Sequence, residues 1–333
     1  MERDHNSYLR NKGNCCHVVQ PEVVTIPALY RVAVCGGTHG NELAGVYLLR
    51  QNMRRKRKGS MVDPVTMVTV MTNPRAVQQC VRYTEMDLNR CFTHATLSAP
   101  VSDVTPYEVV RAQELNALLG PKGDLAAVDL LCDLHSSTAN VGLCLITHSD
   151  SDWICLHICK HLQRELVTIP VRYVHYDVPK SEAYTLHSVG KHGFAMEVGP
   201  QPHGVIRANV FTAMQEAVHL TLEWVRLFNS GTQFEGGSVD VYTMVENIKY
   251  PQDPHTHTIS AAVHPELQDR DFCLLHPGDP VFLSFSGETL RYKGKEALYP
   301  FFVNECAFYE TGVALSLARR RKVKIPAIQC SRM

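Results

Sequence analysis

The sequence lacks the features that place a protein in a membrane or in an oxidising compartment. Its 333 residues contain no run of about 18 apolar residues, so no transmembrane helix is predicted. The first five residues lack the apolar core of a secretory signal. The 12 cysteines include no C-x-x-C pair, and several of them lie within apolar runs. We therefore expect a reduced cytoplasmic protein, and peripheral association with a membrane stays open.

An excess of charge is also missing, since Lys+Arg and Asp+Glu both number 33 and the formal net charge is zero. Two short basic runs, at 54–58 and 319–322, are interpreted as solvated stretches, and we expect no nucleic-acid partner. The G-x-S-x-G elbow of serine hydrolases, the G-x-G-x-x-G fingerprint and the P-loop are absent. These absences exclude a nucleophilic serine and a nucleotide-binding loop.

Predicted strands and helices alternate along the first two thirds of the chain. Apolar runs predict strands at 30–34, 65–71, 126–134, 142–147, 167–174 and 194–198, with helical patterns at 43–51, 107–119, 151–165 and 209–229. This alternation predicts an α/β fold with a mixed or mostly parallel sheet. After Gly231, frequent Gly and Pro residues separate short apolar runs, which predicts a smaller, mostly β domain.

The length of the chain favours two domains over one. We expect a loosely held extension over residues 1–27, because this stretch is polar and irregular. A catalytic domain would follow over residues 28–230, and the β-rich C-terminal domain would cover residues 231–333.

Residues that can bind a metal directly follow two of the predicted strands. His39 and Glu42 lie in the sequence Gly-Gly-Thr-His-Gly-Asn-Glu at 36–42, and His135 closes the strand at 126–134. In an open α/β sheet, loops at the carboxyl ends of strands can converge on a ligand. Two histidines and one glutamate form a three-ligand zinc set with one position left for water, so we expect one Zn²⁺ per chain. Taken alone, an H-x-x-E sequence or a single histidine after a strand is common in proteins that bind no metal.

Two further groups of polar residues have a functional and a structural interpretation. Glu197 lies within the apolar run at 194–198, where it is either a general base beside the metal or one half of a buried ion pair. Arg82, Asn89 and Arg90 follow another strand. They could hold a carboxylate by bidentate hydrogen bonds, or they could lie in a surface loop with solvated arginines.

Together these motifs resemble the aspartoacylase family, within the zinc carboxypeptidase-like hydrolases. The matching motifs are Gly-Gly-Thr-His-Gly-Asn-Glu at 36–42, Asp-Leu-Asn-Arg at 87–90, Asp-Leu-His at 133–135 and Glu-Val-Gly-Pro-Gln-Pro at 197–202. The resemblance extends through Tyr-Pro-Phe-Phe-Val-Asn-Glu at 299–305 and covers roughly residues 28–312. Within the family, the chain most resembles the members that act on N-acyl aromatic amino acids and mercapturates.

The resemblance implies a role for each of these residues. The His, Glu and His named above would bind zinc, and Glu197 would activate the water. Arg82 would polarise the scissile carbonyl, while Asn89 and Arg90 would hold the carboxylate of a small N-acyl amino acid. The resemblance also implies a zinc carboxypeptidase-like mixed-sheet domain, a smaller β domain folded over the site, and a homo-oligomer (dimer or tetramer).

Two departures from the family bear on specificity. His187 stands where aspartoacylase has the arginine that binds the side-chain carboxylate of aspartate, and a neutral imidazole holds that group less well. The late Tyr-Tyr pair of the family reads Phe308-Tyr309, which removes a hydroxyl and adds apolar surface. Both departures favour an apolar or aromatic substrate side chain. His187, Phe308 and Tyr309 are therefore candidate substrate-binding residues.

Other functions remain open at this point. The chain could be an aspartoacylase acting on N-acetyl-aspartate, or a peptidase of the wider carboxypeptidase group. It could also be a non-catalytic zinc-binding interaction protein. Against this last function, every catalytic position that the resemblance implies is occupied, Glu197 and Arg82 included.

Overall fold

The computed structural model describes residues 23–56 and 65–331. Residues 1–22 of the expected extension therefore lie outside the described residues. Its last part is a strand: β1 (Val23–Ile26) pairs in parallel with β14 (Ala327–Cys330). The first basic run begins at the end of α1 (Leu43–Lys56) and continues outside the described residues.

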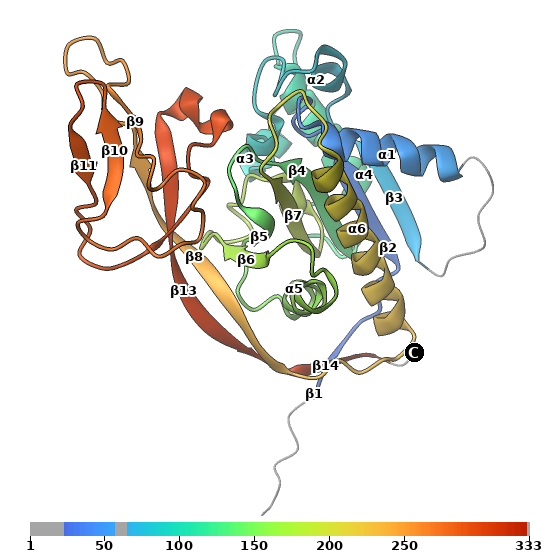
Figure 1. The fold of residues 1–333 in the computed structure, drawn as a ribbon. Coiled ribbons are helices and arrows are strands. Elements are labelled where there is room, and N and C mark those ends of the chain that lie inside the picture. Colours follow the sequence, from blue (N-terminus) through green and yellow to red (C-terminus); the bar gives the residue numbers. More distant parts are fainter. Residues whose placement is uncertain (1–22, 57–64, 332–333) are drawn as a thin grey trace, which may run out of the picture.

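A large mixed sheet is the centre of the fold (Figure 1). Within the described residues its nine strands are, in spatial order, β12 (Tyr299–Phe301), β13 (Val313–Ile325), β8 (Gly237–Lys249), β6 (Val171–His175), β5 (Gly142–Thr147), β7 (His192–Gly199), β4 (Leu130–Ser136), β2 (Arg31–Gly36) and β3 (Thr66–Met71). The neighbours β3, β2, β4 and β7 run parallel, and β5 pairs antiparallel with β7. The prediction of an α/β fold with a mixed sheet is confirmed.

Helices cover both faces of the part of this sheet that contains β2 and β4, which explains why these strands are continuous apolar runs. Val32 and Val34 of β2 pack in one core with α1, α5 (Trp153–Glu165) and α6 (Ala208–Asn229). Ala33 and Cys35 point to the other face, where they pack with α4 (Tyr107–Leu119). Successive side chains of a strand point to opposite faces, so a single strand contributes to both cores.

Short helices connect these elements. They are α2 (Pro74–Gln79), η1 (Leu88–Arg90), α3 (His94–Ser98), η2 (Leu186–Val189) and η3 (Cys306–Thr311). They are too short for a helical period to stand out in the sequence. Local capping still marks two of them, since the side chains of Asn73 and Thr93 accept hydrogen bonds from the backbone of α2 and α3.

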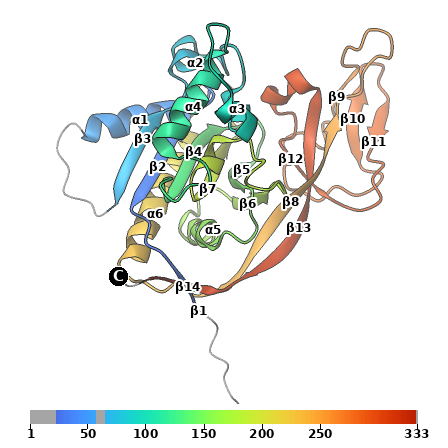
Figure 2. The same cartoon turned by 180° about the vertical axis from the view of Figure 1, so that it is seen from behind.

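A long two-stranded ribbon connects the C-terminal part to the rest of the fold. β8 and β13 pair antiparallel along most of their length, and Figures 1 and 2 show the ribbon curving away from the helices toward β9 (Ala261–Val263), β10 (Pro280–Ser284) and β11 (Thr289–Arg291). This part has its own apolar core, so the prediction of a smaller, mostly β domain is confirmed. The boundary near residue 230 falls between α6 and β8 and stays a prediction.

Two surface features bear on possible partners. In the second basic run, Arg319 pairs with Glu296 and Arg321 contacts Asp150, so acidic neighbours offset much of the positive charge there. In the described part of the chain, no helix combines the length and the apolar character needed to cross a membrane.

Candidate active site

The fold brings the three candidate metal ligands together at the carboxyl ends of two parallel strands. His39 and Glu42 lie in the turn between β2 and α1, and His135 lies in β4, the neighbour of β2. The Nδ1 atom of His39 is 2.6 Å from Oε1 of Glu42 and 3.2 Å from Nδ1 of His135. Nδ1 of His135 is 3.0 Å from Oε2 of Glu42. All three side chains are buried, and their ligand atoms lie within 4.8 Å of one another.

A glycine allows this turn to pack closely against its neighbour. A Cβ atom on Gly40 would lie 2.0 Å from the backbone carbon of Ala76 in α2, so no larger residue fits between His39 and Glu42 at this position. The amide of Gly40 also donates to the carbonyl oxygen of Arg82 at 3.3 Å. The turn that carries His39 and Glu42 is therefore fixed to the loop that carries Arg82.

Each of the two imidazoles contacts a carboxylate through Nε2, the ring nitrogen that faces away from the ligand cluster. Nε2 of His39 lies 3.0 Å from Oδ1 of Asp87, and Nε2 of His135 lies 2.7 Å from Oδ2 of Asp133. A carboxylate accepts hydrogen bonds, so in each neutral imidazole the proton is on Nε2 and the lone pair on Nδ1. In that state two lone pairs and the Glu42 carboxylate face one another. Burial would lower the pKa of His135, but the carboxylates of Asp133 and Glu42 raise it well above its usual value, so the cluster attracts positive charge. This donor set fits a bound cation such as zinc.

Glu197 stands beside these ligands, because β7 is the next strand of the sheet. In the β4–β7 register Glu197 is the partner of His135. Burial raises the pKa of the Glu197 carboxyl to about 8, and the negative charges of Glu42 and Glu305 add to this effect. Among the described residues, Glu197 forms no ion pair within 4.0 Å, so the buried ion pair is not the reason for its position.

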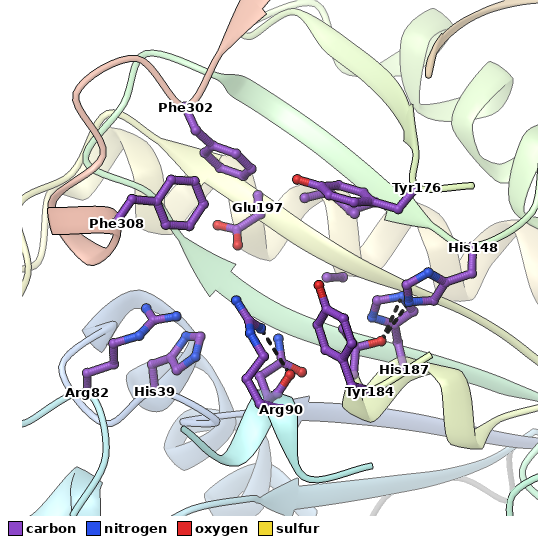
Figure 3. Close-up of a pocket in the computed structure, with 14 residues that line it drawn as sticks. His39, Arg82, Arg90, His148, Tyr176, Tyr184, His187, Glu197, Phe302 and Phe308 are labelled. Carbon is purple, nitrogen blue, oxygen red and sulfur yellow. Dashed lines mark hydrogen bonds between the residues drawn. The ribbon is translucent and has the colours of Figure 1, made fainter. Parts of the chain in front are cut away.

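Figure 3 shows the pocket that joins these groups to the arginines, with Arg82 and His39 at one end and Arg90 in the middle. Arg82 donates from Nη2 to Oδ2 of Asp87 at 3.0 Å, and its Nη1 is 3.4 Å from Oε1 of Glu42. Its side chain is 17% exposed, which rules out a solvated surface arginine. The carboxylate Asp87 therefore holds both His39 and Arg82.

Asn89 and Arg90 line the same pocket from η1. Oδ1 of Asn89 accepts a hydrogen bond from the amide of Leu186 at 3.0 Å, which links η1 to η2. The guanidinium of Arg90 lies 4.9 Å from the centre of the Tyr184 ring. Both side chains are thus held in place at the pocket wall, as a carboxylate-binding pair must be.

The far end of the pocket is formed by two stacked histidines (Figure 3). The rings of His148 and His187 are 4.9 Å apart and nearly parallel, at 11°. The Thr185 hydroxyl lies 2.9 Å from Nε2 of His148 and 3.3 Å from Nε2 of His187. Burial and Lys122 lower the pKa of His148 to about 4, while burial and His148 lower the pKa of His187 well below its usual value. Both rings are therefore uncharged at neutral pH.

Aromatic residues complete the pocket, two of them from the C-terminal part. Phe302 and Phe308 line it and meet edge to face, with ring centres 5.4 Å apart. Glu305 binds this part to the loop after the strand that carries His135, since its Oε2 accepts from the amides of Thr138 at 2.8 Å and Ala139 at 3.2 Å. The C-terminal part thus contributes directly to the pocket.

The structure does not bring Tyr309, the last candidate substrate-binding residue, into the pocket. Its side chain is 47% exposed. Its hydroxyl donates to Oδ1 of Asn304 at 2.6 Å, and its ring lies 5.0 Å from that of Tyr250. Phe308, the residue before it, points into the pocket in its place.

Several pocket residues were missed from the sequence: Ile146, His148, Tyr176, Tyr184, Thr185 and Phe302. A signal was present for one of them. His148 directly follows β5, as His135 closes β4, and a polar residue at the carboxyl end of a strand is a candidate for a site.

Two family models match the chain in the order of its two parts. The succinylglutamate desuccinylase/aspartoacylase catalytic domain matches residues 28–224, and the AstE/AspA barrel-sandwich hybrid domain matches residues 237–320. The chain therefore belongs to the succinylglutamate desuccinylase/aspartoacylase family. It is an amidohydrolase of this family.

Relatives with a named activity are similar over nearly the whole chain. The N-acyl-aromatic-L-amino acid amidohydrolase (carboxylate-forming) B of Danio rerio is 58% identical over 92% of this chain and 98% of its own. The Homo sapiens protein of that name is 43% identical over 90% of this chain and 93% of its own. The crystal structure of murine aminoacylase 3 matches with a TM-score of 0.88 at 40% identity, covering 92% of this chain and all of the other.

Proposed function

We propose that the protein hydrolyses the amide bond of N-acyl amino acids with the help of one zinc ion per chain. It favours N-acetyl aromatic amino acids and N-acetylcysteine S-conjugates (mercapturates), and it releases a carboxylate and a free amino acid. The observation that carries this proposal is a single pocket lined by His39, Glu197 and two arginines, with His39 belonging to the buried His-Glu-His cluster at its wall. The activities for which the relatives described above are named support the same reaction.

In this proposal His39, Glu42 and His135 hold the zinc ion. Bound there, zinc would lower the pKa of a coordinated water to about 7 and polarise the substrate carbonyl. Its positive charge would also lower the pKa of Glu197 from the raised value that burial gives. A base whose pKa lies near the working pH transfers protons most effectively.

The residues of the chain perform the remaining steps. Glu197 takes a proton from the water that attacks the carbonyl carbon, and it returns this proton to the amine nitrogen as the C–N bond breaks. Arg82 donates hydrogen bonds to the amide oxygen while negative charge develops on it. Asn89 and Arg90 hold the α-carboxylate, which fixes the orientation of the amide. One water is consumed, and acetate and the amino acid leave.

The far end of the pocket supports the substrate preference. The stacked imidazoles of His148 and His187 are uncharged and flat, and Tyr176 and Tyr184 add aromatic surface beside them. A planar, uncharged side chain packs well against such walls. A side-chain carboxylate would lose its hydration there without gaining a cationic partner, which disfavours N-acetyl-aspartate.

One variant tests this preference directly. With wild-type protein we expect a higher kcat/KM for N-acetyl-tyrosine than for N-acetyl-aspartate. His187→Arg adds a permanent charge and should shift the ratio toward N-acetyl-aspartate about 10- to 100-fold, since a hydrogen bond to a charged group contributes about 1.5–3 kcal/mol. His187→Gln, which stays neutral, is the matched control. A wild-type preference for N-acetyl-aspartate would overturn the substrate assignment while leaving the mechanism intact.

The other expectations stay predictions. A homo-oligomer and a cytoplasmic location rest on the family resemblance and on the sequence. A non-catalytic zinc-binding protein is the alternative of a different class, and it predicts bound zinc without acetate release. Against it, the pocket is lined by Glu197 and Arg82, to which the proposal gives the roles of base and hydrogen-bond donor.

A further inference from the structure

The loop between α2 and η1 has no regular structure of its own, yet it carries two residues of the pocket. Arg82 and Asp87 lie near its two ends, and residues 81–87 belong to no helix or strand. Backbone amides that are taken away from water need a partner, and here neither a helix nor a sheet supplies one. The amides of Thr84, Glu85 and Met86 therefore have no partner within a helix or a sheet.

Glu108 accepts hydrogen bonds from these amides. This residue lies in the first turn of α4, and its side chain is fully buried. Its Oε1 accepts from the amide of Thr84 at 2.7 Å and from the Thr84 hydroxyl at 2.8 Å. Its Oε2 accepts from the amides of Glu85 and Met86, both at 3.2 Å. One carboxylate thus binds three consecutive residues of the loop.

A further hydrogen bond connects Glu108 to the metal-binding turn. Nδ2 of Asn73 donates to Oε1 of Glu108 at 3.2 Å, and the amide of Asn73 donates to the carbonyl oxygen of Gly37 at 3.2 Å. The carbonyl of Arg82 in turn accepts from the amide of Gly40. Glu108 is therefore the common anchor of the Arg82 loop and of the turn that contains His39.

The anchor is a charged carboxylate whose partners are all neutral. Burial alone would raise the pKa of Glu108, but the hydrogen bonds from Thr84, Asn73 and Met86 outweigh burial and hold the pKa below its usual value. Its place in the first turn of α4 adds the favourable field of a helix N-terminus. A side chain that only filled space at position 108 would not need to be ionised. A buried ionised carboxylate persists only where several hydrogen-bond donors satisfy it.

We propose that Glu108 is a positioning residue for amide hydrolysis, because it fixes the loop that aims the Arg82 guanidinium at the substrate carbonyl. This proposal rests on the proposed function, in which Arg82 stabilises the developing negative charge. Glu108 itself does not line the pocket and touches no substrate. Its effect reaches the reaction through the backbone of residues 82–86.

Glu108→Gln tests the proposal with almost no change in shape. The Gln side chain turns an NH₂ group toward backbone N–H donors, so part of the loop loses its acceptor. A displacement of Arg82 of the order of 1 Å should lower kcat about 10- to 100-fold. KM should change less than about threefold, because Asn89 and Arg90 are anchored separately through Leu186 and Tyr184. Thr84→Val, a milder change, should lower kcat about threefold in the same way.

Asp129 offers a matched control at the opposite end of the sheet. Its Oδ2 accepts from the amides of Tyr30 and Arg31, both at 2.8 Å, so it is also a largely buried carboxylate that binds consecutive backbone amides. Asp129→Asn should lower the Tm without lowering kcat. Loss of kcat to the same extent in both variants would show a general loss of stability and would overturn the proposal.

A double-mutant cycle with Arg82→Ala separates the proposal from the proposed function. If Glu108 acts through Arg82, then Glu108→Gln should lower kcat less than about twofold in the Arg82→Ala background. An undiminished loss in that background would overturn the positioning role and leave the role of Arg82 intact. Full activity of Arg82→Ala alone would overturn both.

Discussion

Replacing Glu197 by Gln should lower kcat about 10²- to 10⁴-fold and leave the zinc content unchanged. Gln has nearly the same shape as Glu but cannot take a proton from water. Glu197 is the neighbour of His135 in the sheet but does not belong to the ligand set, so metal binding should persist. Acetate release from N-acetyl-tyrosine and zinc content, measured on the same preparation, check both parts of the prediction.

Glu246→Gln is the control for this substitution. Glu246 is an exposed carboxylate on β8, away from the pocket, so its replacement should leave turnover unchanged. Near-normal turnover of Glu197→Gln would contradict the assignment of Glu197 as the base. Loss of zinc from that variant would instead show that Glu197 helps to hold the metal.

Replacing Arg82 by Ala should lower kcat about 10²- to 10³-fold, the loss expected when one donor to a developing oxyanion is removed. Arg82 is held by Asp87 and faces the ligand set, so its guanidinium is in place before substrate binds. Arg82→Lys should recover only part of the activity, because one ammonium cannot reproduce the fork that contacts both Asp87 and Glu42. Steady-state kinetics with N-acetyl-tyrosine measure the effect.

Arg75→Ala provides the matched comparison for Arg82. The Arg75 side chain is 58% exposed and packs over the ring of Tyr107, outside the pocket. Its removal should leave kcat unchanged within about twofold. If Arg82→Ala raised KM and left kcat unchanged, Arg82 would bind the substrate and the transition state equally. That result would contradict its proposed role.

The sheet and the His-Glu-His cluster could be predicted from the sequence because both depend on local patterns. Strands buried on two faces appear as apolar runs, and His39, Glu42 and His135 directly follow such runs. The parallel order of β2, β4 and β7 then brings their carboxyl ends to one edge. Once the order of strands is fixed, convergence of the ligands follows from the geometry of the sheet.

The rest of the pocket depends on contacts between distant segments, which no local pattern contains. Thr185 hydrogen-bonds to His148 only because η2 packs beside the end of β5. Asp87 orients the imidazole of His39, and Asp133 orients that of His135. The sequence alone could not show which aspartate contacts an imidazole. Tyr309 was a candidate substrate-binding residue from the sequence, but its hydroxyl bonds to Asn304 and its side chain does not line the pocket. Its neighbour in sequence, Phe308, lines the pocket instead.

The central claim is that zinc at His39, Glu42 and His135 supports hydrolysis of N-acyl amino acids. The most direct measurement is acetate release from N-acetyl-tyrosine and zinc content on one sample, before chelation, after chelation and after zinc is returned. We expect about one zinc per chain, loss of acetate release in step with loss of zinc, and recovery when zinc is restored. Undiminished release from zinc-free protein would contradict the claim, and so would bound zinc without release from any N-acyl amino acid.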